Sequence, residues 1–154
     1  QALVVEAIRS HLAPLCTEIK GDSAPETLEL THCRHLISRI SGRLHPAVDD
    51  DTLLARLHPT PAVGGSPTET ALQWIDREEP FDRGIYAGPV GWVAADAAEF
   101  CVALRSGLVQ DRYLSVYNGA GIVSGSDPDE EWAEIETKMM SFLRVVGLAP
   151  KYEG

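Results

Sequence analysis

The chain has 154 residues, of which 44% are hydrophobic and 23% charged, a composition typical of a globular domain. Its net charge of −10 argues against a nucleic-acid partner, because phosphate binding requires a concentrated basic face. No apolar run reaches the length of a membrane span, and no secretory leader pattern opens the chain, so we expect no membrane partner. The three cysteines, Cys16, Cys33 and Cys101, are widely spaced and favour a reducing compartment, which predicts a cytoplasmic protein.

The first 44 residues predict a helix followed by extended chain. Apolar residues at helical spacing indicate a helix over 2–19, with Pro14 as the point where it would kink or break. The segment 27–44 is rich in Leu, Ile and Thr and predicts strands. The chain begins with Gln1 inside this helical pattern, with no methionine and no capping residue before it. We therefore expect the chain to be a piece of a longer protein.

The middle of the chain predicts two short helices and then a set of strands. A short helix over 51–57 lies between proline-containing loops, and a second helix over 68–78 follows Pro67. After Gly84, short polar turns separate three candidate strands at 85–93, 99–108 and 112–118. Such short connections are typical of an antiparallel meander.

The last predicted helix runs from Pro128 to about residue 146. Asp127 is a suitable N-cap, proline suits the first helical position, and Glu130 follows three residues after the cap. The acidic residues of the first turn also suit the positive end of the helix dipole. These signals make the beginning of this helix the best defined boundary in the sequence.

Two interpretations of this helix face remain open on the residues alone. Glu131, Glu134 and Lys138 share one face, so Glu134 and Lys138 could form an ordinary salt bridge on a solvated helix. Alternatively, the two carboxylates could bind Mg²⁺, and the lysine could bind the carboxylate of a substrate. Gly119 and Gly121, which end the preceding strand, permit a ligand to approach the backbone closely and favour the second interpretation.

Four segments in order resemble one protein family. They are HPTPAVGGSP (58–67), FDRGIYAGPVGW (81–92), ALRS (103–106) and GAGIVSGSDPDEEWAEIETK (119–138). Together they resemble the C-terminal part of the chorismate-utilising enzymes, which include isochorismate, salicylate, anthranilate and aminodeoxychorismate synthases. Ala62 stands where salicylate and anthranilate synthases tend to have threonine. This residue favours the isochorismate synthases within the family, since a small apolar side chain leaves room for water near the reacting ring.

The resemblance implies a Mg²⁺ site and a carboxylate clamp. Glu134 resembles the metal ligand of the last helix, and Glu131 is a second carboxylate close to the metal. The resemblance also implies substrate-binding roles for Lys138, beside the ring carboxylate, and for a set that holds the enolpyruvyl carboxylate, namely Tyr86, Arg105 and the backbone at Gly119 and Gly121. His35 is similar in position to the family's histidine near the C4 hydroxyl, which makes it the catalytic candidate present in the chain.

The residues themselves support these roles unequally. In a strand over 99–108, Arg105 would share its face with the small residues Cys101 and Ala103, as a ligand-facing arginine requires, although a charge at a sheet edge is the alternative. Tyr86 could be an ordinary core tyrosine whose hydroxyl is satisfied. His35 could be a strand histidine without a catalytic role.

The implied fold and activity follow from the same resemblance. The family fold is α+β, with antiparallel sheets packed as a sandwich and helices outside, and the chain at 1–154 would be its C-terminal part. The family reaction is the Mg²⁺-dependent conversion of chorismate, here to isochorismate, for menaquinone or siderophore synthesis. In the family, a lysine that activates water, a glutamate that protonates the leaving hydroxyl and a further metal-binding glutamate lie upstream of Gln1. We therefore expect the 154 residues alone to be inactive, and to self-associate or to pair with the missing upstream half.

Overall fold

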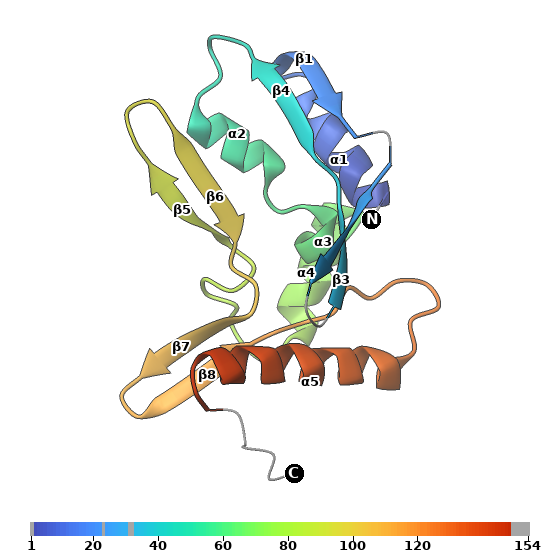
Figure 1. Ribbon diagram of the computed structural model, residues 1–154, viewed down its shortest axis with the longest axis vertical. Coiled ribbons are helices and arrows are strands. Elements are labelled where there is room, and N and C mark those ends of the chain that lie inside the picture. Colours follow the sequence, from blue (N-terminus) through green and yellow to red (C-terminus); the bar gives the residue numbers. More distant parts are fainter. Residues whose placement is uncertain (1, 23, 31–32, 149–154) are drawn as a thin grey trace. The chain divides into compact units, whose positions relative to one another are not determined.

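The computed structural model describes residues 2–22, 24–30 and 33–148, and the side chains of residues 28–35 lie outside this description. The chain divides into two compact units, Gln1–Glu78 and Glu79–Gly154, which are treated separately below. Helices and antiparallel strand pairs occur in both units, and each described strand belongs to a two-stranded sheet (Figure 1). The predicted α+β class is confirmed.

The first unit begins with a helix that is shorter than predicted. Helix α1 (Ala2–Leu12) ends before Pro14, and strand β1 (Cys16–Gly21) follows and pairs antiparallel with β4 (Ile40–Leu44). The helix prediction over 2–19 was therefore wrong beyond Leu12. The proline ring prevents the helix from continuing, and β-branched residues after it favour pairing in a sheet.

The rest of the first unit follows the predicted order. The extended segment 27–44 is confirmed as strands β2 (Glu26–Leu30), β3 (Cys33–Ile37) and β4, of which β2 and β3 pair with each other. Helices α2 (Asp50–Leu57) and α4 (Thr68–Glu78) agree with the predicted ranges, and a single turn, α3 (Pro61–Gly64), lies between them. A small core of buried side chains lies where α1 meets β1, at Leu12, Leu15 and Cys16.

The strands of the second unit form two separate hairpins. Strand β5 (Pro89–Val93) pairs with β6 (Ala98–Val102), and β7 (Ser106–Gln110) pairs with β8 (Tyr113–Tyr117). The predicted strand over 99–108 is therefore two strands, because the chain turns between them. In that turn the Leu104 amide donates to the Val102 carbonyl at 2.8 Å, and Arg105 has a φ of +51°. The continuous meander predicted from the sequence was wrong.

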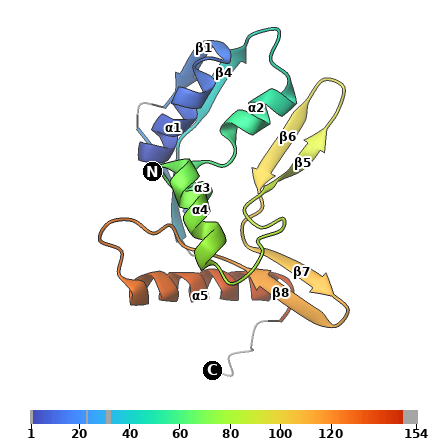
Figure 2. The same cartoon turned by 180° about the vertical axis from the view of Figure 1, so that it is seen from behind.

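Helix α5 (Pro128–Val145) follows the β7–β8 hairpin in the chain (Figures 1 and 2) and contacts it through Phe142. A Cβ atom added at Gly107 of β7 would lie 2.9 Å from the Phe142 ring of α5, so glycine allows the strand to approach the helix. The predicted helix range is confirmed. This packing places the residues that follow β8 beside the middle of the helix.

The described residues bury little apolar surface. Four hydrophobic residues are buried, whereas large apolar side chains such as Trp74, Ile85, Trp92 and Trp132 are exposed. A domain of this length normally buries most of the surface of its unfolded chain. The structure therefore leaves apolar surface that a further part of a protein could cover. No described helix combines the length and the apolar character that crossing a membrane requires.

Gly91 provides a test of the β5–β6 pairing. A Cβ atom at this position would meet the Glu99 carbonyl and would lie 2.8 Å from the Phe100 Cα atom. Backbone atoms cannot move aside as a flexible side chain can, so we expect Gly91→Ala to lower the free energy of unfolding by roughly 2 kcal/mol or more. Denaturant titration followed by circular dichroism measures this loss. Gly121→Ala is the matched control, because a Cβ atom there meets nothing within 4 Å and should cost under about 0.5 kcal/mol.

Candidate active site

Asn118 links the end of β8 to helix α5. Its side-chain Nδ2 donates to the Ile135 carbonyl of α5 at 2.9 Å, and its Oδ1 accepts from the Gly119 amide at 2.9 Å. One side chain therefore fixes both the distance from strand to helix and the orientation of the peptide before Gly119. The Gly119 carbonyl in turn accepts from Lys138 Nζ at 3.3 Å.

Tyr86 lies in a turn before β5 and is directed at the same glycine. A Cβ atom on Gly119 would be 2.6 Å from the Tyr86 hydroxyl, so any residue but glycine would displace the tyrosine. The Tyr86 ring stacks on the Tyr117 ring, and the two ring centroids are 5.7 Å apart. The Arg83 guanidinium lies 5.7 Å from the centroid of the Tyr86 ring. Burial raises the pKa of the Tyr86 hydroxyl, although the nearby Arg83 charge opposes this shift. Tyr86 therefore keeps its proton at neutral pH and can donate a hydrogen bond.

Helix α5 contributes an ion pair and a second carboxylate to this region. Lys138 Nζ lies 2.6 Å from Glu134 Oε1, and the lysine side chain is 24% exposed while the glutamate is 56% exposed. Glu131 accepts a hydrogen bond from the Ser126 hydroxyl at 2.6 Å. The salt bridge of the solvated-helix interpretation is present. It does not exclude the second interpretation, because the same lysine also reaches the Gly119 carbonyl.

The N-terminus of α5 is capped as predicted. Asp127 Oδ1 accepts from the amides of Asp129 and Glu130 at 3.0 and 3.1 Å, and Pro128 occupies the first turn. This cap defines where the helix that carries the two glutamates and Lys138 begins.

Removing the cap gives a stability prediction. We expect Asp127→Ala to lower the free energy of unfolding by about 1 kcal/mol, since two amides lose their acceptor. Asp129→Ala removes the same charge from the same turn and leaves the cap intact, so it should cost less. Denaturant titration of both variants distinguishes the cap from the charge, and equal losses would contradict the prediction.

Arg105 lies after β6 and not within a strand. The alternation argument, which placed its side chain on one face with Cys101 and Ala103, was therefore wrong, because the left-handed backbone at Arg105 ends the alternation. Arg105 is exposed. The Ala87 amide donates to the Ala103 carbonyl at 3.0 Å, so the turn that carries Tyr86 lies beside the residues preceding Arg105.

The predicted site residues are divided between the two units. The second unit contains Tyr86, Arg105, Gly119, Gly121, Glu131, Glu134 and Lys138. Among these, close contacts join Tyr86, Gly119, Lys138 and Glu134 into one group, the Gly119 cluster. The first unit contains Ala62, exposed in α3, and His35, whose backbone pairs with Leu28 in the β2–β3 hairpin and whose side chain lies outside the described ones.

The donor set of α5 is compatible with Mg²⁺. This ion commonly takes one or two protein carboxylates and completes its coordination with water and an anionic substrate. Glu134 and Glu131 supply two carboxylates one helical turn apart, and Glu134 is more than half exposed. No cluster of three or more His, Cys, Asp or Glu side chains occurs among the described residues, so a protein-only cage is absent from that part of the chain.

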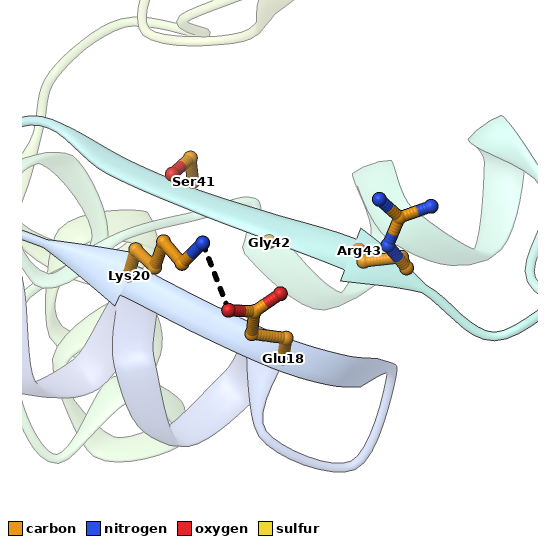
Figure 3. Close-up of a pocket in the computed structure, with 5 residues that line it drawn as sticks. All are labelled: Glu18, Lys20, Ser41, Gly42 and Arg43. Carbon is orange, nitrogen blue, oxygen red and sulfur yellow. Dashed lines mark ion pairs between the residues drawn. The ribbon is translucent and has the colours of Figure 1, made fainter.

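The pocket found among the described residues is not at the Gly119 cluster. A hollow of about 320 Å³ lies on the paired strands β1 and β4 of the first unit and is lined by the residues drawn in Figure 3, Glu18, Lys20, Ser41, Gly42 and Arg43. Lys20 Nζ pairs with Glu18 Oε1 at 2.9 Å, and both side chains are more than half exposed. None of the predicted site residues lines this hollow, which is a polar strand face.

Sequence reasoning missed Asn118 and Tyr117. Asn118 joins β8 to α5, and Tyr117 packs against Tyr86 on one side and Phe81 on the other. An asparagine directly before the glycine pair was a usable signal, because its side chain often bonds neighbouring backbone at the end of an element. The partner in α5 is 17 residues away and could not be read from the sequence.

Residues 1–147 match a protein family described as chorismate binding enzymes. The chain is 41% identical over 148 residues to the chloroplastic isochorismate synthase of Catharanthus roseus, covering 96% of this chain and 26% of that protein.

Solved structures agree with this match. The chain resembles DhbC from Bacillus anthracis with a TM-score of 0.88 and 37% identity, over 96% of this chain and 40% of the other. It resembles MenF, the menaquinone-specific isochorismate synthase from Escherichia coli, with a TM-score of 0.83 and 41% identity, over 92% and 32%. The chain thus spans between a quarter and two fifths of the length of these relatives.

Proposed function

Because this chain belongs to the chorismate-binding enzymes, we propose that it is the C-terminal part of an isochorismate synthase. The complete enzyme would convert chorismate to isochorismate by adding water at C2 and releasing the C4 hydroxyl. The observation that carries the proposal is the Gly119 cluster, in which a neutral tyrosine hydroxyl and a lysine meet at the half-buried backbone of Gly119 and a glutamate pairs with that lysine. These groups suit a substrate with two carboxylates and a cation that neutralises them.

The residues of the second unit would bind and orient the substrate. Tyr86 can donate a hydrogen bond from its hydroxyl to the enolpyruvyl carboxylate, and the exposed Arg105 can bind the same carboxylate with its planar guanidinium. The Gly119 amide already donates to the Asn118 side chain, so the backbone amides that could donate a hydrogen bond to a substrate are those of the next residues, up to Gly121. Holding the substrate in one orientation is itself a large contribution to rate.

Glu134 and Glu131 would hold Mg²⁺ beside this clamp. When bound there, the ion supplies positive charge that anchors the ring carboxylate and polarises the ring. Lys138 lies where it can pair with that carboxylate once its contact with Glu134 is released. Their spacing along α5 keeps these three side chains on one face of the helix.

The groups that move protons would come from outside these 154 residues. In the family, a lysine activates the water and a glutamate protonates the leaving hydroxyl, and both lie in upstream motifs. We therefore propose that the chain alone is inactive. The exposed apolar side chains of both units suit burial against the upstream part of the enzyme or, in its absence, against a second copy.

Turnover of chorismate by the full-length parent protein tests the proposal. With Mg²⁺ and without ammonia, we expect isochorismate as the product, identified by chromatography. Release of pyruvate together with salicylate would favour a salicylate synthase, and a product that requires ammonia would favour the aminating enzymes. Either result would overturn the inference from Ala62. Absence of any turnover together with chorismate binding that ignores Mg²⁺ would indicate a non-catalytic member of the family.

A further inference from the structure

Lys138 is held by two acceptors that belong to different parts of the second unit. Its Nζ atom lies 2.6 Å from Glu134 Oε1 on its own helix and 3.3 Å from the Gly119 carbonyl after β8. The shorter contact is the ion pair, so the ammonium occupies one side of the carboxylate proposed to bind a cation. The lysine is three-quarters buried, which holds it near both acceptors, while the glutamate keeps a solvent-facing side.

We propose that Lys138 is the resident counter-ion of Glu134 and competes with the divalent cation for that carboxylate. This inference rests on the proposed function, because it takes Glu134 as a metal ligand. An ammonium and a dication repel each other when they share one carboxylate, so cation binding requires Lys138 to leave Glu134. The free protein therefore binds the cation more weakly than its carboxylates alone would.

The Gly119 carbonyl remains as a hydrogen-bond acceptor for Lys138 after the ammonium has left Glu134. Asn118 accepts from the Gly119 amide and donates to the Ile135 carbonyl of α5, so the chain at Gly119 is kept beside the helix by contacts that do not involve Glu134. After displacement, Lys138 keeps one acceptor and has donors left for a substrate carboxylate. The positive charge thus becomes available to the substrate only after the cation has arrived. Lys138 acts here as a positioning residue that couples the two binding events.

Calorimetric titration of the full-length parent protein with Mg²⁺, without chorismate, tests this competition. We expect Lys138→Gln to lower the Kd for Mg²⁺ by about fivefold to tenfold, because the competing charge is gone. Lys138→Arg retains the charge and should bind Mg²⁺ within about twofold of the unmodified protein. Lys20→Gln is the matched control, since it removes one positive charge and one ion pair, to Glu18, in the other unit. It should leave the Kd unchanged.

A second substitution separates failure of this inference from failure of the proposed function. If Glu134→Gln does not weaken Mg²⁺ binding, the proposed metal site is wrong and the inference falls with it. If Glu134→Gln weakens binding but Lys138→Gln and Lys20→Gln give the same Kd, the metal site stands and the competition is refuted. Support requires that Lys138→Gln tightens binding in the unmodified background and has no effect once Glu134 is replaced. Circular dichroism of each variant verifies that it is folded.

Discussion

Replacing Glu134 with glutamine is expected to reduce chorismate turnover by the full-length enzyme about 1000-fold, equivalent to about 4 kcal/mol of transition-state stabilisation. The amide keeps the size of the side chain and removes the negative charge that would hold Mg²⁺ beside the substrate carboxylate. It also releases Lys138, which loses its ion-pair partner at 2.6 Å. Initial rates of isochorismate formation over a range of Mg²⁺ concentrations measure the effect, and added Mg²⁺ should restore little of the rate.

Glu136→Gln is the matched control for this prediction. Glu136 lies on the same helix, two residues further along, and accepts a hydrogen bond from Trp132 Nε1 at 3.2 Å, which a glutamine oxygen can also accept. The substitution makes the same change in net charge and should leave turnover within about twofold of the unmodified enzyme, as for most exposed sites. If turnover by the Glu134→Gln variant stays within tenfold of the unmodified enzyme, the proposed role of Glu134 as a metal ligand is wrong.

Gly119→Ala is expected to lower kcat/KM by about 100-fold, the size of effect that a displacement of about 1 Å can produce. The added Cβ atom would lie 2.6 Å from the Tyr86 hydroxyl, and the tyrosine cannot simply swing aside because its ring stacks on Tyr117. The hydroxyl that would hold the substrate carboxylate must therefore move. Steady-state kinetics with chorismate, together with thermal melting, measure the loss.

The double variant Gly119→Ala with Tyr86→Phe tests whether the clash is the cause. Removing the hydroxyl removes the atom that the new methyl group meets, so the stability lost in Gly119→Ala should largely return. Turnover should not return, since the hydroxyl is also the proposed donor to substrate. If the stabilities of the two single variants add without coupling, the contact between Gly119 and Tyr86 does not limit the site.

Local signals in the sequence determined the helices of this chain. Asp127 and Pro128 fixed the beginning of α5, and Pro67 preceded α4, because capping and proline effects depend only on neighbouring residues. The same reasoning placed Glu131, Glu134 and Lys138 on one face, since helical periodicity needs no partner. The same local reasoning extended the first helix too far, because the effect of Pro14 was given too little weight. Local chemistry is sufficient when the interaction spans a few residues.

The strands were less predictable because pairing is decided at longer range. Nothing in the segment 99–108 announced a left-handed turn at Arg105, a conformation that a non-glycine residue adopts at a cost which the tertiary structure must offset. For the same reason the alternation argument assigned Arg105 a face that it does not have. The division into two hairpins depends on which strand edges meet, and alternation of apolar residues cannot specify this.

By itself, the sequence determined the chemistry available to this protein: two carboxylates and a lysine on one helix, a glycine pair before it, and motifs that resemble the chorismate-utilising enzymes. The tertiary structure decided which of these groups meet. It brought Tyr86 to Gly119, added the Gly119 carbonyl as a second acceptor for Lys138, and added Asn118 as the link between strand and helix. These contacts join residues 17 to 33 positions apart, so they depend on how the turn before β5, the end of β8 and helix α5 come together in the folded unit.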